Sequence, residues 1–230
     1  MRLFRNRTDA GHQLAKVLAP YTYADGKPPS QHNIQSDVIV LGLARGGVPV
    51  AYEIAHILHR PLGVMLVRKL GVPGHEELAM GAVASGNVRI LNEDVIQSLA
   101  IPDSVIENAI EVQLQEIARR EAIFGAGLTS ADVAGKTVIL ADDGVATGAT
   151  MRAAIAALRA QQPARIVVAI GVAPPDVCQS MASLVDEFIC LLRPRGFWSV
   201  GMWYEDFSQL TDEDVRALFR SAKAQRVLIP

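Results

Sequence analysis

Two adjacent carboxylates end an apolar run in the segment VILADDGVATGAT, which covers residues 138–150. Asp142 and Asp143 would repel a phosphate, but carboxylates accept hydrogen bonds from vicinal hydroxyls and can face a bound magnesium ion. The residues that follow are small or carry hydroxyls, and a glycine such as Gly148 lets the backbone approach a ligand closely. A diol acceptor beside a phosphate cradle indicates a site for a phosphorylated ribose.

The elements that would hold this site follow from the spacing of apolar residues. Short β-branched runs alternate with longer segments of helical period, which predicts an α/β fold with a central, mainly parallel sheet flanked by helices. We expect strands at Asp37–Leu43, Leu62–Arg68, Thr137–Ala141, Arg165–Gly171 and Glu187–Leu191, and a hairpin from Ala79–Ala84 and Val88–Leu91.

Helices are expected between these strands and after the last one. They cover Asp9–Leu18, Val48–Leu58, Asp103–Phe124, Thr147–Gln161, Pro175–Leu184 and Asp212–Ala222, with N-caps at Thr8 or Asp9, at Asp103 and at Thr211. Residues 142–150 then lie between a strand end and a helix start. Open parallel sheets bind ligands at such turns, and the free N–H groups of a helix start favour an anion.

Composition sets bounds on the class of protein. The 230 residues fit one compact domain, and half of them are apolar, so the chain should fold. A net charge of −2 gives no basic footprint for nucleic acid. Cys178 and Cys190 form neither a CxxC motif nor a zinc-type cluster, and no apolar run approaches the ~18 residues of a spanning helix. We expect a soluble, cytoplasmic protein with neither nucleic acid nor a membrane as its partner.

The pattern of an apolar strand, two acids and ThrGlyxThr resembles the 5-phosphoribosyl-1-pyrophosphate (PRPP) signature of type I phosphoribosyltransferases at all thirteen positions. The resemblance implies the type I phosphoribosyltransferase fold in a single domain over residues 1–230, with a core at about 37–192 and a small hood from 1–36 and 193–230. It implies that Asp142 and Asp143 hold the ribose hydroxyls. The 5-phosphate would be bound by Val145, Ala146, Thr147, Gly148, Ala149 and Thr150. The alternative is a plain turn capped by Asp142 and tightened by glycines.

Two further segments are similar to anion-binding parts of this family. The turn after the first strand looks like the pyrophosphate loop, with Ala44, Arg45, Gly46 and Gly47 as its residues; a tight turn is the alternative. Arg68 and Lys69 precede a polar, glycine-containing segment placed like the family's flexible catalytic loop. They would neutralise the leaving pyrophosphate, or else belong to a solvated strand end.

Five aromatic side chains crowd residues 197–207, which suggests either a planar ligand or a packed corner. The segment also resembles the base-binding end of hypoxanthine-type phosphoribosyltransferases. That alignment puts Trp198 near the base-stacking position and Glu205 or Asp206 near an acidic position beside the metal and pyrophosphate. The 6-oxopurine enzymes carry a third acid where this chain has Ala146, which disfavours hypoxanthine and guanine and is similar to the adenine and uracil branches.

The opening of the chain, FRNRTDAGHQLA from residue 4, resembles a group of stand-alone bacterial phosphoribosyltransferases of unsettled substrate. Together these resemblances predict transfer of the 5-phosphoribosyl group of PRPP to a nitrogen base, with pyrophosphate released and Mg²⁺ as cofactor. The resemblance implies PRPP and a nucleobase-like acceptor as partners, and also a homodimer, since a dimer is common among the relatives. No general base is identified. A regulatory protein that senses PRPP or a nucleotide is a second hypothesis. A sugar-phosphate hydrolase is a third, although adjacent strand residues point to opposite faces and no nucleophile and base are paired.

Overall fold

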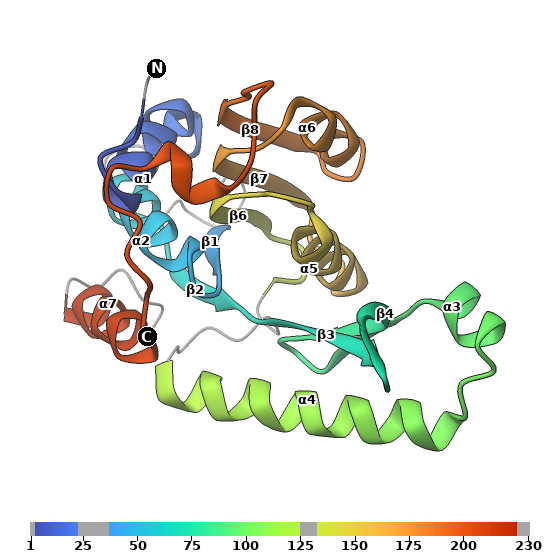
Figure 1. The fold of residues 1–230 in the computed structure, drawn as a ribbon. Helices are drawn as coiled ribbons and strands as arrows, with labels where there is room; N and C mark the ends of the chain where they lie inside the picture. Colours follow the sequence, from blue (N-terminus) through green and yellow to red (C-terminus); the bar gives the residue numbers. More distant parts are fainter. Residues whose placement is uncertain (1–2, 23–36, 125–132, 225–230) are drawn as a thin grey trace.

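The computed structural model describes residues 3–22, 37–124 and 133–224, apart from the side chains of Glu76 and Glu77. Its centre is a five-stranded sheet in the order β2–β1–β6–β7–β8, and every neighbouring pair is parallel (Figure 1). The strands are β1 (Val38–Leu43), β2 (Leu62–Met65), β6 (Thr137–Gly144), β7 (Arg165–Val172) and β8 (Glu187–Leu192). This confirms the predicted α/β fold with a central parallel sheet.

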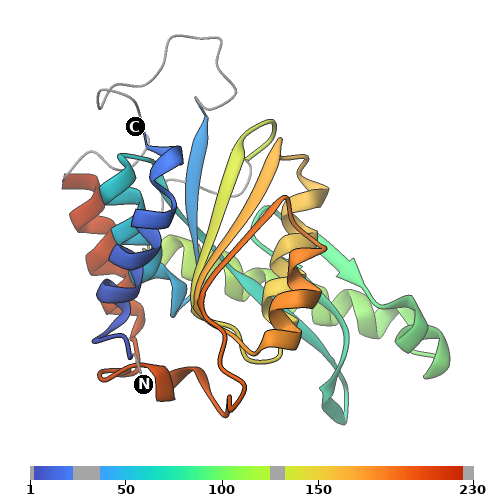
Figure 2. The same cartoon turned by 90° about the horizontal axis from the view of Figure 1, so that it is seen from above.

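Helices cover both faces of this sheet (Figure 2). On one face lie α1 (Arg7–Val17), α2 (Gly47–Leu58) and α7 (Asp212–Ala224), and on the other lie α5 (Ala149–Ala160) and α6 (Pro175–Ala182). Because both faces are covered, β1 is buried at all six positions. The continuous apolar runs in the sequence are the consequence of this double burial. Among the described residues, no helix has the length and apolar character needed to span a membrane.

A second, antiparallel sheet of three strands lies between α4 (Asp103–Phe124) and α5 (Figure 1). It consists of β3 (Val67–Val72), β4 (His75–Ala84) and β5 (Val88–Leu91), and it confirms the predicted hairpin around residues 85–87. The prediction of one strand from Leu62 to Arg68 was wrong. The Ser85 side chain accepts a hydrogen bond from the Leu66 N–H at 3.1 Å, and the chain leaves the main sheet there. The segment after Lys69, predicted as a loop, instead forms the end of β3, a turn at residues 73–74 and the start of β4.

Helix ends differ from the predicted ones where side chains supply the caps. The N-cap of α1 is Asn6, whose Oδ1 accepts the Asp9 N–H at 2.9 Å, rather than Thr8 or Asp9. The cap of α7 is Thr211, as predicted. A short helix, α3 (Glu93–Ser98), was not predicted; Asn92 caps it.

The start of the described chain packs against the segment that follows β8, over the carboxyl ends of the strands. Phe4 donates its N–H to the Trp203 carbonyl at 2.9 Å and accepts from the Glu205 N–H at 2.8 Å. The Phe4 and Tyr204 rings lie 5.1 Å apart and pack with Val172 at the end of β7. Residues 3–6 and 200–208, here called the terminal layer, therefore form one packed unit on the sheet.

Gly171 makes the close contact between β7 and the terminal layer possible. A Cβ atom there would lie 2.6 Å from both the Asp143 carbonyl oxygen and the Tyr204 hydroxyl oxygen. We expect Gly171→Ala to lower the free energy of unfolding by about 1–3 kcal/mol, as overpacking does. Gly196→Ala is the matched control, because a Cβ atom there meets no described atom within 4 Å, and it should change stability by less than about 0.5 kcal/mol. Urea denaturation measures both variants, and equal midpoints would contradict the packing described.

Candidate active site at the ends of strands β1 and β6

Three hollows adjoin at the carboxyl ends of the central strands, and Thr150 lines all of them. The acidic cleft, of about 530 Å³, is lined by Arg7, Leu43, Ala44, Arg45, Gly46, Asp142, Asp143, Thr150, Phe207, Gln209 and Leu210. The loop pocket, of about 170 Å³, is lined by Asp142 and by residues 144–151. The apolar pocket, of about 340 Å³, lies between the second sheet and α5. The cleft and the loop pocket share Asp142 as well as Thr150, so they flank one carboxylate.

The loop pocket is built from the turn between β6 and α5. The turn is held on one side by the Val145 N–H, which donates to the Val172 carbonyl at 2.8 Å. Gly148 has φ +83°, a conformation that favours glycine, and a Cβ atom there would also collide with the Met181 methyl group. The first turn of α5 is closed by the Arg152 N–H on the Gly148 carbonyl, so the preceding N–H groups project from the helix end. The structure thus brings all six predicted phosphate-binding residues around one small hollow suited to an anion.

The acid pair lies at the end of β6. Asp142 accepts the Asp143 N–H on Oδ1 at 2.9 Å, and Asp143 is 7% exposed. Burial raises the pKa of Asp142 well above its ordinary value, and the negative charge of Asp143 adds to this shift. Burial also raises the pKa of Asp143, while the neighbouring Arg7 guanidinium opposes that shift. The pair therefore holds negative charge that the fold itself disfavours and that a cationic or hydroxyl-bearing ligand would stabilise.

Arg7 is the charged residue at this site that the sequence analysis missed. Its Nε donates to Asp143 Oδ2 at 2.7 Å, its Nη1 donates to the Ser208 carbonyl at 2.9 Å, and its Cζ lies 3.9 Å from the centroid of the Phe207 ring. Tyr204 also contacts Asp143, by donating its hydroxyl to the backbone carbonyl at 2.6 Å; burial raises the pKa of Tyr204, which keeps the donor protonated. The only sequence feature that pointed to Arg7 was the resemblance of the opening segment to a group of bacterial phosphoribosyltransferases. That resemblance assigned no role to individual residues.

The predicted pyrophosphate loop follows β1 and faces the acid pair. Ala44, Arg45 and Gly46 line the acidic cleft, and the Ala44–Arg45 peptide bond is cis. A Cβ atom on Gly46 would collide with the Asp143 carboxylate, and one on Gly47 would collide with the Ala141 carbonyl oxygen. Both glycines are therefore required by the close approach of α2 to the end of β6.

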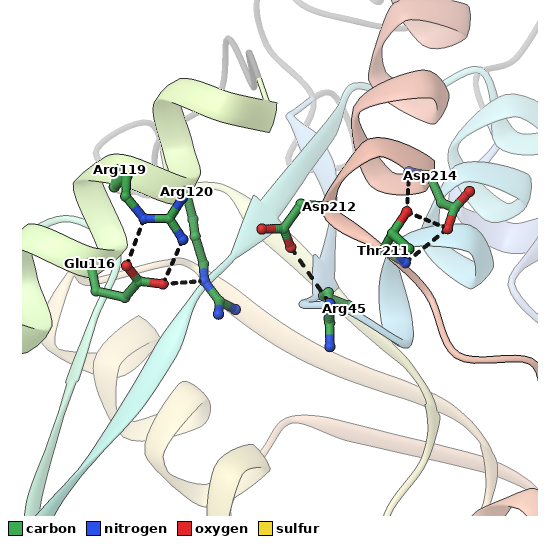
Figure 3. A network of polar contacts seen from close by, with 7 residues as sticks. All are labelled: Arg45, Glu116, Arg119, Arg120, Thr211, Asp212 and Asp214. Atoms are coloured by element: carbon green, nitrogen blue, oxygen red, sulfur yellow. Dashed lines mark hydrogen bonds and ion pairs between the residues drawn. The ribbon is translucent and has the colours of Figure 1, made fainter.

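Arg45 is restrained from the far side of the cleft. Its Nη1 lies 3.7 Å from Asp212 Oδ1 at the start of α7, and Figure 3 shows this pair between α7 and α4. On α4, Glu116 binds Arg119 and Arg120, and the Asp212 charge also acts on Arg119. A contact of 3.7 Å between partly exposed side chains is weak, so Arg45 can turn toward a bound anion.

Arg68 and Lys69 are separated by the alternation of β3. Lys69 lines the apolar pocket together with Thr150, and so lies on the side of the site. Arg68 points to the other face, where its Nε donates to Gln113 Oε1 on α4 at 2.9 Å. The structure therefore brings only Lys69 of this pair near the predicted phosphate loop.

Three predicted residues of the C-terminal segment line none of the three hollows. Trp198 is 84% exposed, and the side chains of Glu205 and Asp206 are exposed on the terminal layer. Asp206 Oδ1 accepts the Ser208 N–H at 3.0 Å. Their roles in base stacking and metal binding stay predictions. By contrast, Trp203 and Tyr204 are buried, so this part of the segment is a packed corner.

Relatives are found by comparison with known proteins. Residues 30–177 match the phosphoribosyl transferase domain family. Proteins from two strains of Mycobacterium tuberculosis, provisionally named phosphoribosyl transferases, are 40% identical over 222 residues, which is 96% of this chain and 47% of theirs. The chain thus spans about half the length of these curated relatives. The crystal structure of a Thermus thermophilus protein, TT1426, is 37% identical with a TM-score of 0.76, and the match covers 96% of this chain and 99% of that one.

The raised pKa of Asp142 makes a prediction about stability. Folding opposes ionisation of this carboxyl, so its negative charge lowers the free energy of unfolding. This loss of stability is absent below pH 3.8, the ordinary pKa, and grows as the pH rises toward and through the raised pKa of the folded state. We expect Asp142→Asn, which keeps an acceptor for the Asp143 N–H, to raise the free energy of unfolding at pH 7, with a gain that shrinks on acidification. Urea denaturation across this range checks it, with Asp94→Asn on the exposed surface of α3 as control. An Asp142→Asn variant less stable than wild type at pH 7 would show that the buried charge is not a cost.

Proposed function

Because the chain belongs to the phosphoribosyltransferase family, we propose that it transfers the 5-phosphoribosyl group of PRPP to a nitrogen base and releases pyrophosphate, with Mg²⁺ as cofactor. The observation that carries this proposal is the position of Asp142, which lines both the acidic cleft and the loop pocket. PRPP has a phosphate at one end of its ribose, a pyrophosphate at the other and a diol between them. The two hollows and the carboxylates between them match that order of groups.

For each group of PRPP, the site offers hydrogen-bond donors or acceptors whose charge is complementary to that group. The helix start at Ala149 and the hydroxyl of Thr150 suit the 5-phosphate. Asp142 and Asp143 accept hydrogen bonds from the ribose hydroxyls, which contribute only donors to such a contact. Arg45 and Gly46 line the acidic cleft, where the guanidinium and the backbone N–H suit the pyrophosphate.

The acid pair also suits magnesium. Hard divalent cations take oxygen ligands, and Mg²⁺ in phosphate sites is usually held by one or two carboxylates together with substrate oxygens. Within the described part of the chain, no group of three or more acidic, histidine or cysteine side chains could hold a metal alone. PRPP would therefore supply most of the ligands, beside Asp142 and Asp143. When bound, the ion would neutralise negative charge on the leaving pyrophosphate.

The reaction breaks the bond between ribose C1 and the pyrophosphate oxygen, which keeps the electron pair. It forms a bond from C1 to the base nitrogen, whose proton is released to solvent. Positive charge develops on the ribose while negative charge grows on the pyrophosphate. The carboxylates at the end of β6 stabilise the former, and the cations of the cleft stabilise the latter. The chain's own residues thus act by orientation and electrostatics on both sides of C1.

The acceptor is proposed to be a nitrogen base other than a 6-oxopurine. The loop pocket has Ala146 at its edge, and a methyl group can neither bind nor deprotonate a purine N7. A screen of nucleobases for PRPP-dependent release of pyrophosphate identifies the acceptor. PRPP binding without release for any base would favour the sensor alternative.

Removal of one charge from the acid pair tests the assignment. We expect Asp143→Asn to lower turnover by well over tenfold, because the neutral amide no longer stabilises the positive ribose and no longer pairs with Arg7. Circular dichroism should show an intact fold, and Asp94→Asn should keep the wild-type rate. Pyrophosphate release at saturating PRPP and Mg²⁺ is the measurement. An unchanged rate for Asp143→Asn would remove the basis for the proposed site.

A further inference from the structure

We propose that Arg7 is a substrate-binding residue whose guanidinium contacts the pyrophosphate group of PRPP while it holds Asp143 in place. This inference rests on the proposed function and assigns a role to the opening segment of the chain, which that function leaves unexplained. Arg7 begins α1, and it is separated from Asp143 by 136 positions in the sequence. Its side chain is only 12% exposed, yet it lines the acidic cleft.

The guanidinium has more donors than its protein contacts use. Nε donates to Asp143 and Nη1 to the Ser208 carbonyl, and a guanidinium carries five N–H groups in all. Among the residues that the structure describes, no hydrogen bond is made by Nη2 of Arg7. Because the side chain lines the cleft, the remaining donors are available to an anion bound there.

The charges of the cleft show which ligand is suited to these donors. Of the described residues, Arg7 and Arg45 are the cations that line it, and Asp142 and Asp143 are the acids. A pyrophosphate carries several negative charges, and Arg68, which the sequence assigned to it, is engaged by Gln113 on the far face of β3. Arg7 lines the cleft in which Arg68 was expected to neutralise the pyrophosphate. Its charge offsets that of Asp143, which would otherwise repel the pyrophosphate from the cleft.

The plane of the guanidinium is fixed before any ligand arrives. Phe207 packs against it at 3.9 Å, and the Ser208 carbonyl anchors one end. A stacked, planar group of this kind binds phosphate oxygens with little further loss of side-chain freedom, which a lysine cannot reproduce. Both the stacking ring and the anchoring carbonyl belong to the terminal layer, so Phe207 and Ser208 of this layer help to form the substrate site.

The test uses the 230-residue chain and two probes, inorganic pyrophosphate with Mg²⁺ and ribose 5-phosphate, both titrated by calorimetry. Arg7→Gln should weaken pyrophosphate binding at least tenfold and ribose 5-phosphate binding by less than threefold, because only the former contacts Arg7. Arg7→Lys should restore part of the lost affinity. Arg5→Gln is the matched control, since Arg5 lies two residues away, is 75% exposed and pairs only loosely with Asp9 at 3.8 Å. It should bind both probes as wild type does.

The outcomes separate this inference from the proposed function. Wild-type affinity for pyrophosphate in folded Arg7→Gln, or an equal loss for both probes, would overturn the role of Arg7 and leave the function standing. If Arg7→Gln does not fold, Arg7→Lys decides: an affinity reduced about threefold or more supports the contact, and an unchanged affinity overturns it. A wild-type protein that binds neither pyrophosphate nor PRPP would overturn both.

Discussion

The ion pair between Arg7 and Asp143 is the interaction on which the arrangement of this protein depends. Two adjacent carboxylates at the end of a buried strand lose hydration and repel each other, so a cation close by stabilises the folded state. That cation comes from the start of α1, and the Asp143 carbonyl is bound in turn by Tyr204. The start of the described chain and the segment after β8 are thus drawn over the carboxyl edge of the sheet. Gly46 and Gly171 are glycines because a Cβ atom at either position would collide with Asp143.

The same constraint produces the shape of the site. With Asp143 held by Arg7, Asp142 is left between a cleft that contains cations and a loop pocket that contains a helix start. A ligand with anionic groups at both ends and hydroxyls in the middle meets its complement in each part. The buried negative charge is a cost to the folded state that ligand binding relieves, which is a common compromise between stability and function.

Much of this could be predicted from the sequence. The five parallel strands could be predicted because strands buried on both faces are continuous apolar runs. The loop after β6 could be predicted because its acids, glycines and hydroxyls are adjacent in the sequence. The predicted fold class, that of type I phosphoribosyltransferases, is confirmed. Two features could not be predicted because they depend on tertiary contacts. The strand ends at Leu66 because the Leu66 N–H donates a hydrogen bond to the Ser85 side chain, and the face of β3 on which Arg68 lies depends on which sheet β3 joins. Arg7 was missed because its partner is distant in sequence. Of the crowded aromatics, Trp203 and Tyr204 pack while Trp198 is exposed, a difference set by tertiary contacts with Phe4 rather than by local pattern.

Calorimetric titration of the protein with PRPP and Mg²⁺, for wild type and for Asp142→Asn side by side, tests the central claim most directly. If Asp142 lies between the phosphate and pyrophosphate sites, wild type binds one PRPP per chain and the variant binds at least tenfold more weakly, although the variant is the more stable protein at pH 7. Absence of PRPP binding to wild type, or equal binding by the two proteins, would contradict the placement of the ribose at the end of β6.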